Sequence, residues 1–264
     1  MQLSPKTETA KRRLAILEEL AHNQVVRVSQ LSKEYGVSEV SIRRDLAHLE
    51  RVGALRRIQG GALAIPGNHA GPCPTSEQPM RHAVEKARIG QAAAALIAPG
   101  DRVIFDSGTT VLQVARSLSQ ELRAAGNLAV ITNSMPIVRE LGPCTGIHLI
   151  LLGGVYLPQY EVTVGPQAVE QLRTLHADKL FLGADGLSLA KGVTTANVLE
   201  AEVNRATIAA AAQVIVVADS SKIGQIGLTT IASFDSVHTL ITDTGAPPDF
   251  IAALREQGVT VIAV

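Results

Sequence analysis

Seven short apolar runs, separated by helical segments, constrain the fold of this chain more than any other feature of its sequence. Each run has the length of a buried strand. Continuous apolar strands that alternate with helices are typical of a parallel sheet covered on both faces. The predicted strands are Val103–Phe105, Leu128–Ile131, His148–Leu152, Lys179–Leu182, Val214–Ala218, Leu240–Ile241 and Val259–Val264, and the predicted helices are Arg81–Ile97, Val111–Leu122, Val198–Ala212 and Pro248–Gln257.

A stretch rich in proline and glycine divides the chain. Proline fixes φ and lacks an amide donor, so neither a helix nor a central strand is expected there. The chain is therefore predicted to have a first domain over residues 1–65, a linker over residues 66–80 and a second domain over residues 81–264. The breaking residues are Pro66, Gly67, Gly71, Pro72, Pro74 and Pro79.

Charge is distributed unevenly between the two predicted domains. The chain has no net charge, but residues 1–65 hold 11 Lys and Arg against 7 Asp and Glu, so they carry +4 and the remainder carries −4. A basic domain joined to an acidic one is typical of a protein that binds a polyanion through its basic part. Four charges are also within ordinary scatter, so the asymmetry only supports the motifs below.

Composition excludes several other classes of protein. Hydrophobic residues make up 46% of the chain and charged residues 18%, the balance of a folded protein. No apolar run reaches the roughly 18 residues of a membrane-spanning helix, and residues 1–10 lack the apolar core of a signal peptide. Cys73 and Cys144 are too few for a metal cage or a disulfide framework, so both are expected to be free thiols. We expect a cytoplasmic protein without metal, cofactor or membrane partner.

The first domain has the pattern of a helix-turn-helix. Ser29 and Ser38 are each expected to cap a helix, and Gly36 is expected to end the helix between them. A turn of about three residues between two such helices is the spacing of a DNA-binding helix-turn-helix, whose second helix enters the major groove. The predicted helices are Lys11–Leu20, with Leu14, Leu17 and Leu20 on its buried face, Gln30–Tyr35 and Glu39–Arg51.

The helix Glu39–Arg51 has a packed face and an open face when it is wound at about 100° per residue. Ile42, Leu46 and Leu49 fall on the packed face. On the open face, Arg44 is suited to guanine and Val40 to a thymine methyl group. An alternative is that the arginines only solvate a surface helix. The open face comprises Val40, Ser41, Arg44, Ala47, His48 and Arg51, with Arg43 at its flank, whereas Asp45 and Glu50 lie nearer the packed face.

A hairpin is predicted after this helix. Two short strands surround the pair Gly60 and Gly61, which is typical of a wing. Arginines on the wing contact phosphates, which adds affinity and salt dependence but little sequence selectivity. The predicted DNA contacts are Ser38, Val40, Ser41, Arg43, Arg44, His48, Arg56, Arg57 and Gln59.

Polar residues follow the first predicted strand of the second domain. Open parallel sheets bind ligands where strands end and helices begin. Gly108 lets the backbone approach a ligand closely, while free amides and the hydroxyl groups of Ser107, Thr109 and Thr110 favour an anion such as phosphate. Serine and threonine are also ordinary helix caps, so the motif has a purely structural explanation as well.

Polar or glycine residues recur at the ends of four further predicted strands, and these ends meet at one edge of the sheet. Lys222 offers a point charge for phosphate, and Asp185 and Asn133 offer partners for sugar hydroxyl groups. Taken singly, each residue is also explained by loop chemistry. The strand ends contain Asn133 and Ser134, Gly153 and Gly154, Gly183–Gly186, and Asp219–Lys222.

The first domain resembles the signature of DeoR-family repressors. The resemblance rests on residues 36–46, on Leu49 and Glu50, and on Gly60–Ala62, and it extends over nearly all of residues 9–264. Family members carry His or Tyr where this chain has Gln59, which leaves the role of that side chain open. The resemblance implies an α/β fold, with an N-terminal winged helix-turn-helix and a mostly parallel sensor domain similar to ribose-5-phosphate isomerase and glucosamine-6-phosphate deaminase.

The resemblance also implies which residues bind an effector. Asp106–Thr110 match the family's phosphate loop, and Asp185, Gly192–Thr195, Glu200 and Lys222 match its sugar-side positions. The effector site is therefore expected to comprise Asp106, Ser107, Gly108, Thr109, Thr110, Asn133, Ser134, Gly153, Gly154, Asp185, Thr195, Glu200 and Lys222.

The function implied by the resemblance is repression of a sugar-catabolism operon by a homo-oligomer, dimer or tetramer, that leaves its double-stranded DNA operator when a phosphorylated sugar binds. The stretches around Gly192, Glu200–Arg205 and Asp219–Lys222 most resemble the N-acetylgalactosamine and related amino-sugar or hexitol regulators.

Two alternatives to this function remain open. Lys191 and Glu200 have the spacing of a lysine and a glutamate in the isomerases, so an active isomerase or deaminase with a fused DNA-binding domain is one of them. The turn Gly183–Gly186 lacks the isomerases' second acid, which favours binding without turnover. The other alternative is regulation by a protein partner, with the edge of the sheet as an evolutionary remnant.

Overall fold

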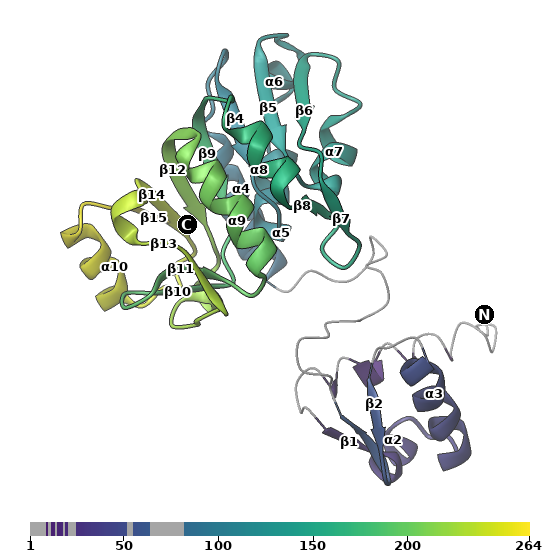
Figure 1. The fold of residues 1–264 in the computed structure, drawn as a ribbon. Helices are drawn as coiled ribbons and strands as arrows, with labels where there is room; N and C mark the ends of the chain where they lie inside the picture. The colour runs from purple at the N-terminus through teal and green to yellow at the C-terminus, as the bar shows by residue number, and fades with distance from the viewer. Residues whose placement is uncertain are drawn as a thin grey trace. The chain divides into compact units, whose positions relative to one another are not determined.

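The computed structural model describes residues 9, 12–13, 15–17, 19–20, 25–51, 55–63 and 82–264 of the chain. The chain divides into two units, Met1–Gln78 and Pro79–Val264 (Figure 1). The predicted linker 66–80, with Cys73, lies outside the described residues, as do Leu14 and the side chain of Arg51.

The first unit is a small winged helix-turn-helix. Its buried side chains come from the helices and from β1 and β3, and they include Ile16, Leu31 and Leu46. The strands form an antiparallel sheet in the order β1-β3-β2. The elements that follow the described helical residues 12–13, 15–17 and 19–20 are β1 Val25–Arg27, α2 Val28–Glu34, α3 Glu39–Arg51, β2 Arg56–Ile58 and β3 Gly61–Leu63.

The turn residues of the first unit behave mostly as predicted. Gly36 has φ of 62°, and Ser38 Oγ accepts a hydrogen bond from Ser41 N at 3.3 Å, so both of these predictions are confirmed. The predicted cap at Ser29 is wrong, because α2 already begins at Val28. Strand β1, which was not predicted, pairs with β3, so that Val28 N donates to Gly60 O at 2.9 Å and the helix starts without a side-chain cap.

The wing depends on a glycine where β3 crosses β1. A Cβ atom at Gly61 would lie 2.0 Å from the Val26 carbonyl oxygen, so no side chain fits there. The predicted hairpin across the pair Gly60 and Gly61 is confirmed, with Gly60 at φ of 81° in the turn.

A seven-stranded parallel sheet organises the second unit (Figure 1). Every neighbouring pair of strands is parallel, and the seven are the seven predicted from apolar runs. The fold class is therefore confirmed. The strand order is β15 Thr260–Ala263, β14 Thr239–Thr242, β12 Ala211–Val217, β9 Ala177–Leu182, β4 Arg102–Phe105, β5 Leu128–Thr132 and β6 Ile147–Leu151.

Both faces of this sheet are buried, because successive strand residues point to opposite sides. Ile104 and Leu180 join one hydrophobic cluster, whereas Phe105 and Phe181 join the other and stack at 5.5 Å between ring centroids. The first cluster is covered by α8 Pro166–Leu172, α9 Val198–Ala209 and α10 Pro248–Glu256, and the second by α4 Ala83–Ala94, α5 Thr109–Arg116, α6 Gln120–Ala124 and α7 Met135–Leu141.

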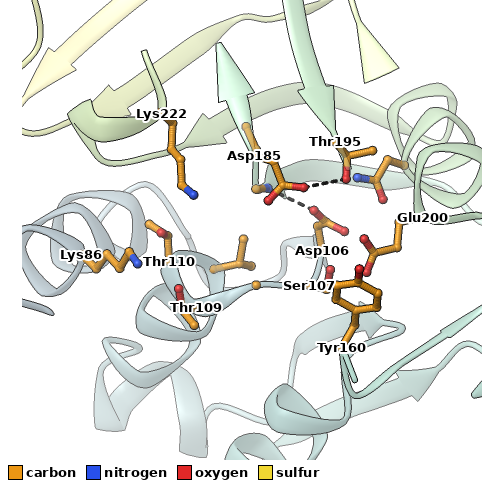
Figure 2. A pocket seen from close by; sticks show the side chains of 15 residues that line it. Lys86, Asp106, Ser107, Thr109, Thr110, Tyr160, Asp185, Thr195, Glu200 and Lys222 are labelled. Atoms are coloured by element: carbon orange, nitrogen blue, oxygen red, sulfur yellow. Dashed lines mark hydrogen bonds between the residues drawn. The ribbon is translucent and has the colours of Figure 1, made fainter. Parts of the chain in front are cut away.

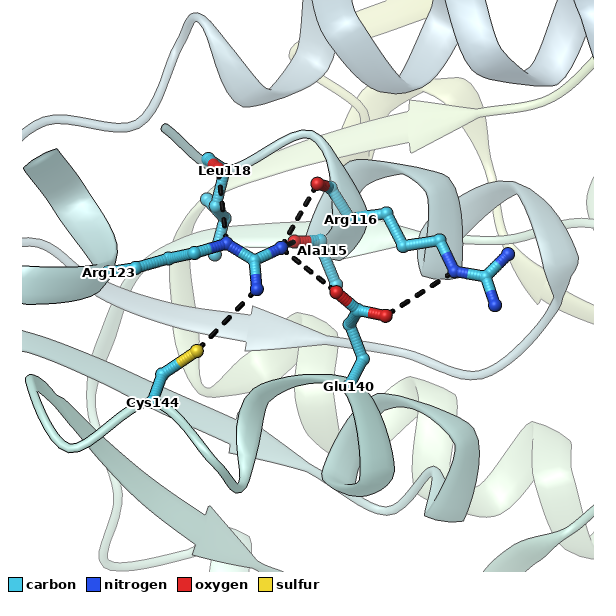
Figure 3. A network of polar contacts seen from close by, with 6 residues as sticks. All are labelled: Ala115, Arg116, Leu118, Arg123, Glu140 and Cys144. Atoms are coloured by element: carbon cyan, nitrogen blue, oxygen red, sulfur yellow. Dashed lines mark hydrogen bonds and ion pairs between the residues drawn. The ribbon is translucent and has the colours of Figure 1, made fainter. Parts of the chain in front are cut away.

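The predicted helix Val111–Leu122 is wrong in extent, since α5 ends at Arg116 and α6 begins at Gln120. The Arg123 guanidinium closes the break by donating to the carbonyl oxygens of Ala115, Arg116 and Leu118 (Figure 3). Cys144, a free thiol as predicted, and Glu140 complete the contacts of Arg123. An arginine at the carboxyl end of a helix satisfies carbonyl groups that have no partner within the helix.

Two small antiparallel sheets accompany the main sheet and were not predicted. Their strands are only three or four residues long, and most include a threonine, serine or glycine or an exposed position, so they lack the continuous apolar runs of the main sheet. The small sheets are β7 Val155–Leu157 with β8 Val162–Val164, and β10 Gly186–Ser188 with β11 Gly192–Thr195 and β13 Thr229–Ala232.

No helix in the described part of the chain is long and apolar enough to cross a membrane.

Candidate functional site

The open face of α3 carries the residues that the winding of the helix predicts. Ile42, Leu46 and Leu49 are buried, whereas Val40 is 56% exposed and Arg44 is exposed. Arg44 has no hydrogen bond or ion pair with the described residues, so its guanidinium is available to a ligand. An apolar residue and an unpaired arginine side by side on a solvent face suit the floor of the major groove.

The arginine at the flank of this face has a different environment. Arg43 pairs with Glu39 at 2.6 Å across one helical turn, and both side chains are about half exposed. Ser38 and Ser41 lie together at the start of the helix, with 3.1 Å between their Oγ atoms. His48 is half-buried, further along α3.

The wing is tied to α3 through Glu50. Its carboxylate accepts a hydrogen bond from Arg57 N at 3.0 Å and lies 3.9 Å from the Arg57 guanidinium. Arg56 and Gln59 are exposed and have no such partner among the described residues. Of the two wing arginines, Arg56 is thus the one free to contact a phosphate.

A buried carboxylate behind α3 is a feature that sequence reasoning missed. Asp45 is 2% exposed, and its two oxygens accept hydrogen bonds from Arg12 Nε at 2.8 Å and from Arg13 Nε at 2.7 Å. This contact joins residues more than 30 positions apart and fixes α3 to the N-terminal helical segment that contains Arg12 and Arg13. The winding of α3 located Asp45 near the packed face but gave no indication of its partners.

In the second unit, a cavity of about 180 Å³ opens at the carboxyl ends of β4, β9 and β12 (Figure 2). β4 and β9 are neighbours in the sheet, and so are β9 and β12, so the loops that follow them meet. This is the edge at which open parallel sheets bind ligands. The predicted residues that line the cavity are Asp106, Ser107, Gly108, Thr109, Thr110, Asp185, Thr195, Glu200 and Lys222.

The loop from β4 to α5 is shaped to receive an anion. Gly108 has φ of 100° at the start of α5, and the space above its Cα is open. The first amides of a helix have no partner within the helix and carry the positive end of its dipole. Thr109 and Thr110 begin that helix and line the cavity, so their amides and hydroxyl groups are placed where they could donate to an anion.

Four predicted effector residues do not line this cavity. Asn133 and Ser134 lie at the end of β5, where Asn133 Nδ2 donates to Thr163 O at 2.9 Å and Ser134 bridges to Val162. Gly153 and Gly154 follow β6, next to Gln171 and β8 respectively. These residues follow β5 and β6, and those two strands lie on the far side of β4 from β9 and β12.

Two lysines stand at one side of the cavity (Figure 2). Lys222 was predicted from the loop after β12. Lys86, on α4, was missed, and it is 7% exposed with its Nζ 3.7 Å from Asp219 Oδ2. A lysine among the alanines of the predicted helix Arg81–Ile97 gives no signal of its role, because its place depends on how α4 packs against α5.

Three carboxyl groups gather on the other side of the cavity. Asp106 Oδ2 accepts a hydrogen bond from Gly183 N at 3.1 Å, and Asp185 Oδ2 accepts from Thr195 Oγ1 at 2.9 Å. Glu200, on α9, is 9% exposed and points into the cavity beside Tyr160 (Figure 2).

Burial makes Asp106 and Glu200 weaker acids than ordinary carboxyl groups, because it raises the pKa of both. Burial raises the pKa of Asp106 to about 7, although hydrogen bonds from Ser107 and Gly183 act in the opposite direction. Burial, followed by the charges of Asp106 and Asp185, raises the pKa of Glu200 to about 8. Near neutral pH these two groups therefore hold protons that ordinary carboxyl groups have released.

Two further cavity residues, Tyr160 and Asn204, were also missed. Tyr160 lies between β7 and β8, and Asn204 lies one turn after Glu200 on α9. The Asn204 amide nitrogen belongs on the side of Asp106 Oδ1, at 3.2 Å, and of the Glu200 carbonyl oxygen, at 2.9 Å, since the opposite assignment brings oxygen against oxygen. The i, i+4 spacing of Glu200 and Asn204 was the one signal available in the sequence.

Comparison with known proteins identifies both units. Residues 12–66 match the DeoR-like helix-turn-helix domain and residues 81–244 match the DeoR C terminal sensor domain. A protein of Escherichia coli O157:H7, provisionally named as an aga operon transcriptional repressor, is 38% identical over 98% of this chain and 95% of its own length. The transcriptional repressor AccR of Agrobacterium fabrum is 34% identical over 90% of each chain.

Similarity to solved structures is lower. Ribose 5-phosphate isomerase A of Methanocaldococcus jannaschii is 18% identical, covers 52% of this chain and 53% of its own, and has a TM-score of 0.38. Similarity at this level indicates nothing about activity. The sequence relatives are named as transcriptional repressors, so the alternative of an active isomerase or deaminase is not supported. The chain belongs to the DeoR family of helix-turn-helix transcriptional regulators, as its resemblance indicated, with a DNA-binding domain followed by a sensor domain.

Proposed function

We propose that this protein represses a sugar-catabolism operon and leaves its operator when a phosphorylated sugar occupies the cavity of the second unit. The observation that carries the proposal is the cavity itself, with lysines and helix amides on one side and hydrogen-bonding carboxyl groups on the other. That pairing suits a phosphate and a polyhydroxylated ring. A relative named for the aga operon supports the amino-sugar branch of the family.

In this proposal the domains are residues 1–65 and 81–264, joined by the linker 66–80, and the protein acts in the cytoplasm as a dimer or tetramer. Lys86 suggests how the two domains communicate. It belongs to α4, the first helix after the linker, and it lines the cavity. A phosphate that attracts Lys86 away from Asp219 would therefore act on the helix that leads to the DNA-binding domain. By linkage, the effector binds the DNA-free form more tightly.

The test of the proposal has two steps. Selection from a random-sequence DNA pool should return an operator, and gel-shift titration at moderate salt should show sequence-selective binding to it. A thermal-shift screen of phosphorylated sugars should then find compounds that raise the melting temperature and weaken operator binding. No sequence-selective binding would refute the DNA part, and an unchanged melting temperature across the screen would favour the protein-partner alternative.

Replacing Arg44 with alanine is expected to cost about 1–3 kcal/mol of operator binding and to reduce discrimination at one base pair, because its unpaired guanidinium reaches a base edge. Competition gel shifts against operators changed at each position measure this. Arg56→Ala is the matched control, since a wing contact to phosphate should weaken all sequences alike and reduce the salt dependence. Equal weakening of all sequences by Arg44→Ala would identify Arg44 as a phosphate contact instead.

Replacing Lys222 with methionine is expected to weaken binding of an effector phosphate by roughly 10- to 100-fold, because a charge-assisted contact is lost while the apolar stem is kept. Isothermal titration with the effector from the screen measures the loss. Lys191→Met is the control, since Lys191 is exposed and does not line the cavity. Similar losses in the two variants would assign the effect to general surface charge.

A further inference from the structure

The cavity has lysines on one side and carboxyl groups on the other, and the described residues place no cation among the carboxyl groups. Figure 2 shows Lys86 and Lys222 on the same side as Thr109 and Thr110, while Asp106 and Glu200 lie across the cavity from them. The side with the lysines is suited to bind the phosphate group of an effector. A sugar phosphate with a neutral ring would bring no positive charge to the side of the cavity that holds the three carboxyl groups.

The hydrogen bonds of the three carboxyl groups single out Glu200. Asp185 accepts hydrogen bonds from Thr195 Oγ1 and from Ala196 N, each at 2.9 Å, and Asp106 accepts one from Gly183 N at 3.1 Å. The Glu200 carboxylate accepts no hydrogen bond from the described residues, although the side chain is about nine-tenths buried and points into the cavity. Burying a carboxylate without a hydrogen-bond donor or a cation costs free energy. We therefore infer that the Glu200 oxygens accept hydrogen bonds from a ligand.

The described residues supply no cation to this half. The positively charged side chains that line the cavity are Lys86 and Lys222, and Lys86 is already paired with Asp219. Burial, together with the charges of neighbouring carboxylates, raises the pKa of Glu200 to about 8 and that of Asp106 to about 7, which agrees with the lack of a protein cation on this side of the described cavity.

We propose that the effector carries a protonated amine and that Glu200, together with Asp185, binds this ammonium group. The inference rests on the proposed function and specifies its ligand as an amino-sugar phosphate with a free amine. An ammonium group brings three donors and the missing positive charge. A hydroxyl group brings one donor and no charge, and an acetamide neutralises no carboxylate.

The experiment compares three probes that differ in one substituent. Isothermal titration at pH 7 with the full-length protein uses 2-amino-2-deoxyhexose 6-phosphate, its N-acetyl derivative and the unsubstituted hexose 6-phosphate, each in the gluco and galacto series. The amine is expected to bind about tenfold more tightly than the other two, or better. If all probes bind with similar affinity, the inference is overturned and the proposed function stands. If none binds, both fail.

Matched variants on one helix test the role of Glu200. Glu200→Gln keeps the shape of the side chain and is expected to remove the preference for the amine while still binding the hexose phosphate. Glu202→Gln, at an exposed position on the same helix, should retain the preference. A loss of affinity by the same factor for all three probes in Glu200→Gln would overturn the inference, because a merely structural role would affect them equally.

A second measurement needs no variant. Titratable groups that face Glu200 are Asp106, Asp185 and Tyr160, with Lys86 and Lys222 on the other side of the cavity. An ammonium group favours the ionised carboxylates, so the amine should release more protons than the hydroxyl analogue, and the shared phosphate cancels in the comparison. Titration of the wild-type protein in two buffers of different ionisation enthalpy measures this difference. Equal proton release by the two probes would overturn the inference.

Discussion

Asp45→Asn is expected to lower the free energy of unfolding of the first unit by about 3 kcal/mol and to abolish operator binding at concentrations that saturate the wild type. The wild-type carboxylate is 2% exposed and accepts hydrogen bonds from Arg12 and Arg13, whose own side chains are 16% and 28% exposed. Asparagine keeps the shape but leaves two largely buried guanidinium groups without a counter-charge. The loss therefore exceeds that of an ordinary surface ion pair.

Hydrogen exchange measured by mass spectrometry tests this prediction, because it reports on each unit of the full-length chain separately. Protection should fall in peptides from residues 25–51 and stay unchanged in peptides from the second unit. Glu39→Gln, which removes the half-exposed pair with Arg43, is the control and should change stability by no more than about 0.5 kcal/mol. Equal effects of the two substitutions would mean that the buried cluster contributes no more than the exposed pair.

The seven strands of the main sheet were predictable because both of their faces are buried. A strand such as Leu180–Leu182, in the middle of the sheet, is apolar at every position, which leaves little ambiguity. The strands of the small sheets are short, and some of them, for example Val155–Leu157, are partly exposed, so they do not stand out from loops. The break between α5 and α6 depends on Arg123, a distant contact that helical periodicity does not record.

The cavity residues that lie just after a strand in the sequence were predicted correctly. The prediction failed for residues whose distance from the cavity depends on the order of the strands in the sheet. Asp106 directly follows β4 and Asp185 lies in the short loop after β9, so their place at the sheet edge follows from the strands. The sequence does not reveal that β5 and β6 lie beyond β4, which takes Asn133 away from the cavity. Lys86 was equally hidden, because α4 reaches the cavity through its packing on α5, where Gly90 meets Gln113 without room for a side chain.

The unliganded protein is expected to lose stability as pH rises from about 5 to about 9. Folding raises the pKa of Glu200 from 4.5 to about 8 and that of Asp106 from 3.8 to about 7. An acid with a raised pKa holds its proton more tightly in the folded state, so the folded protein binds more protons than the unfolded chain between those values. The free energy of unfolding therefore decreases with pH across this window and levels off above it.

Glu200→Gln is expected to remove much of this decrease, because glutamine has no proton to lose and its neutrality also lowers the pKa of Asp106. At about 1.4 kcal/mol per pKa unit, a rise of the Glu200 pKa from 4.5 to about 8 means that the variant should exceed the wild type by on the order of 4 kcal/mol at pH 9 and match it near pH 5. Urea unfolding of the second unit across this range, without ligand, measures the difference. The exposed Glu202→Gln should follow the wild-type curve. A constant offset between Glu200→Gln and wild type at every pH would contradict the prediction, because it would show that folding does not raise the pKa of Glu200.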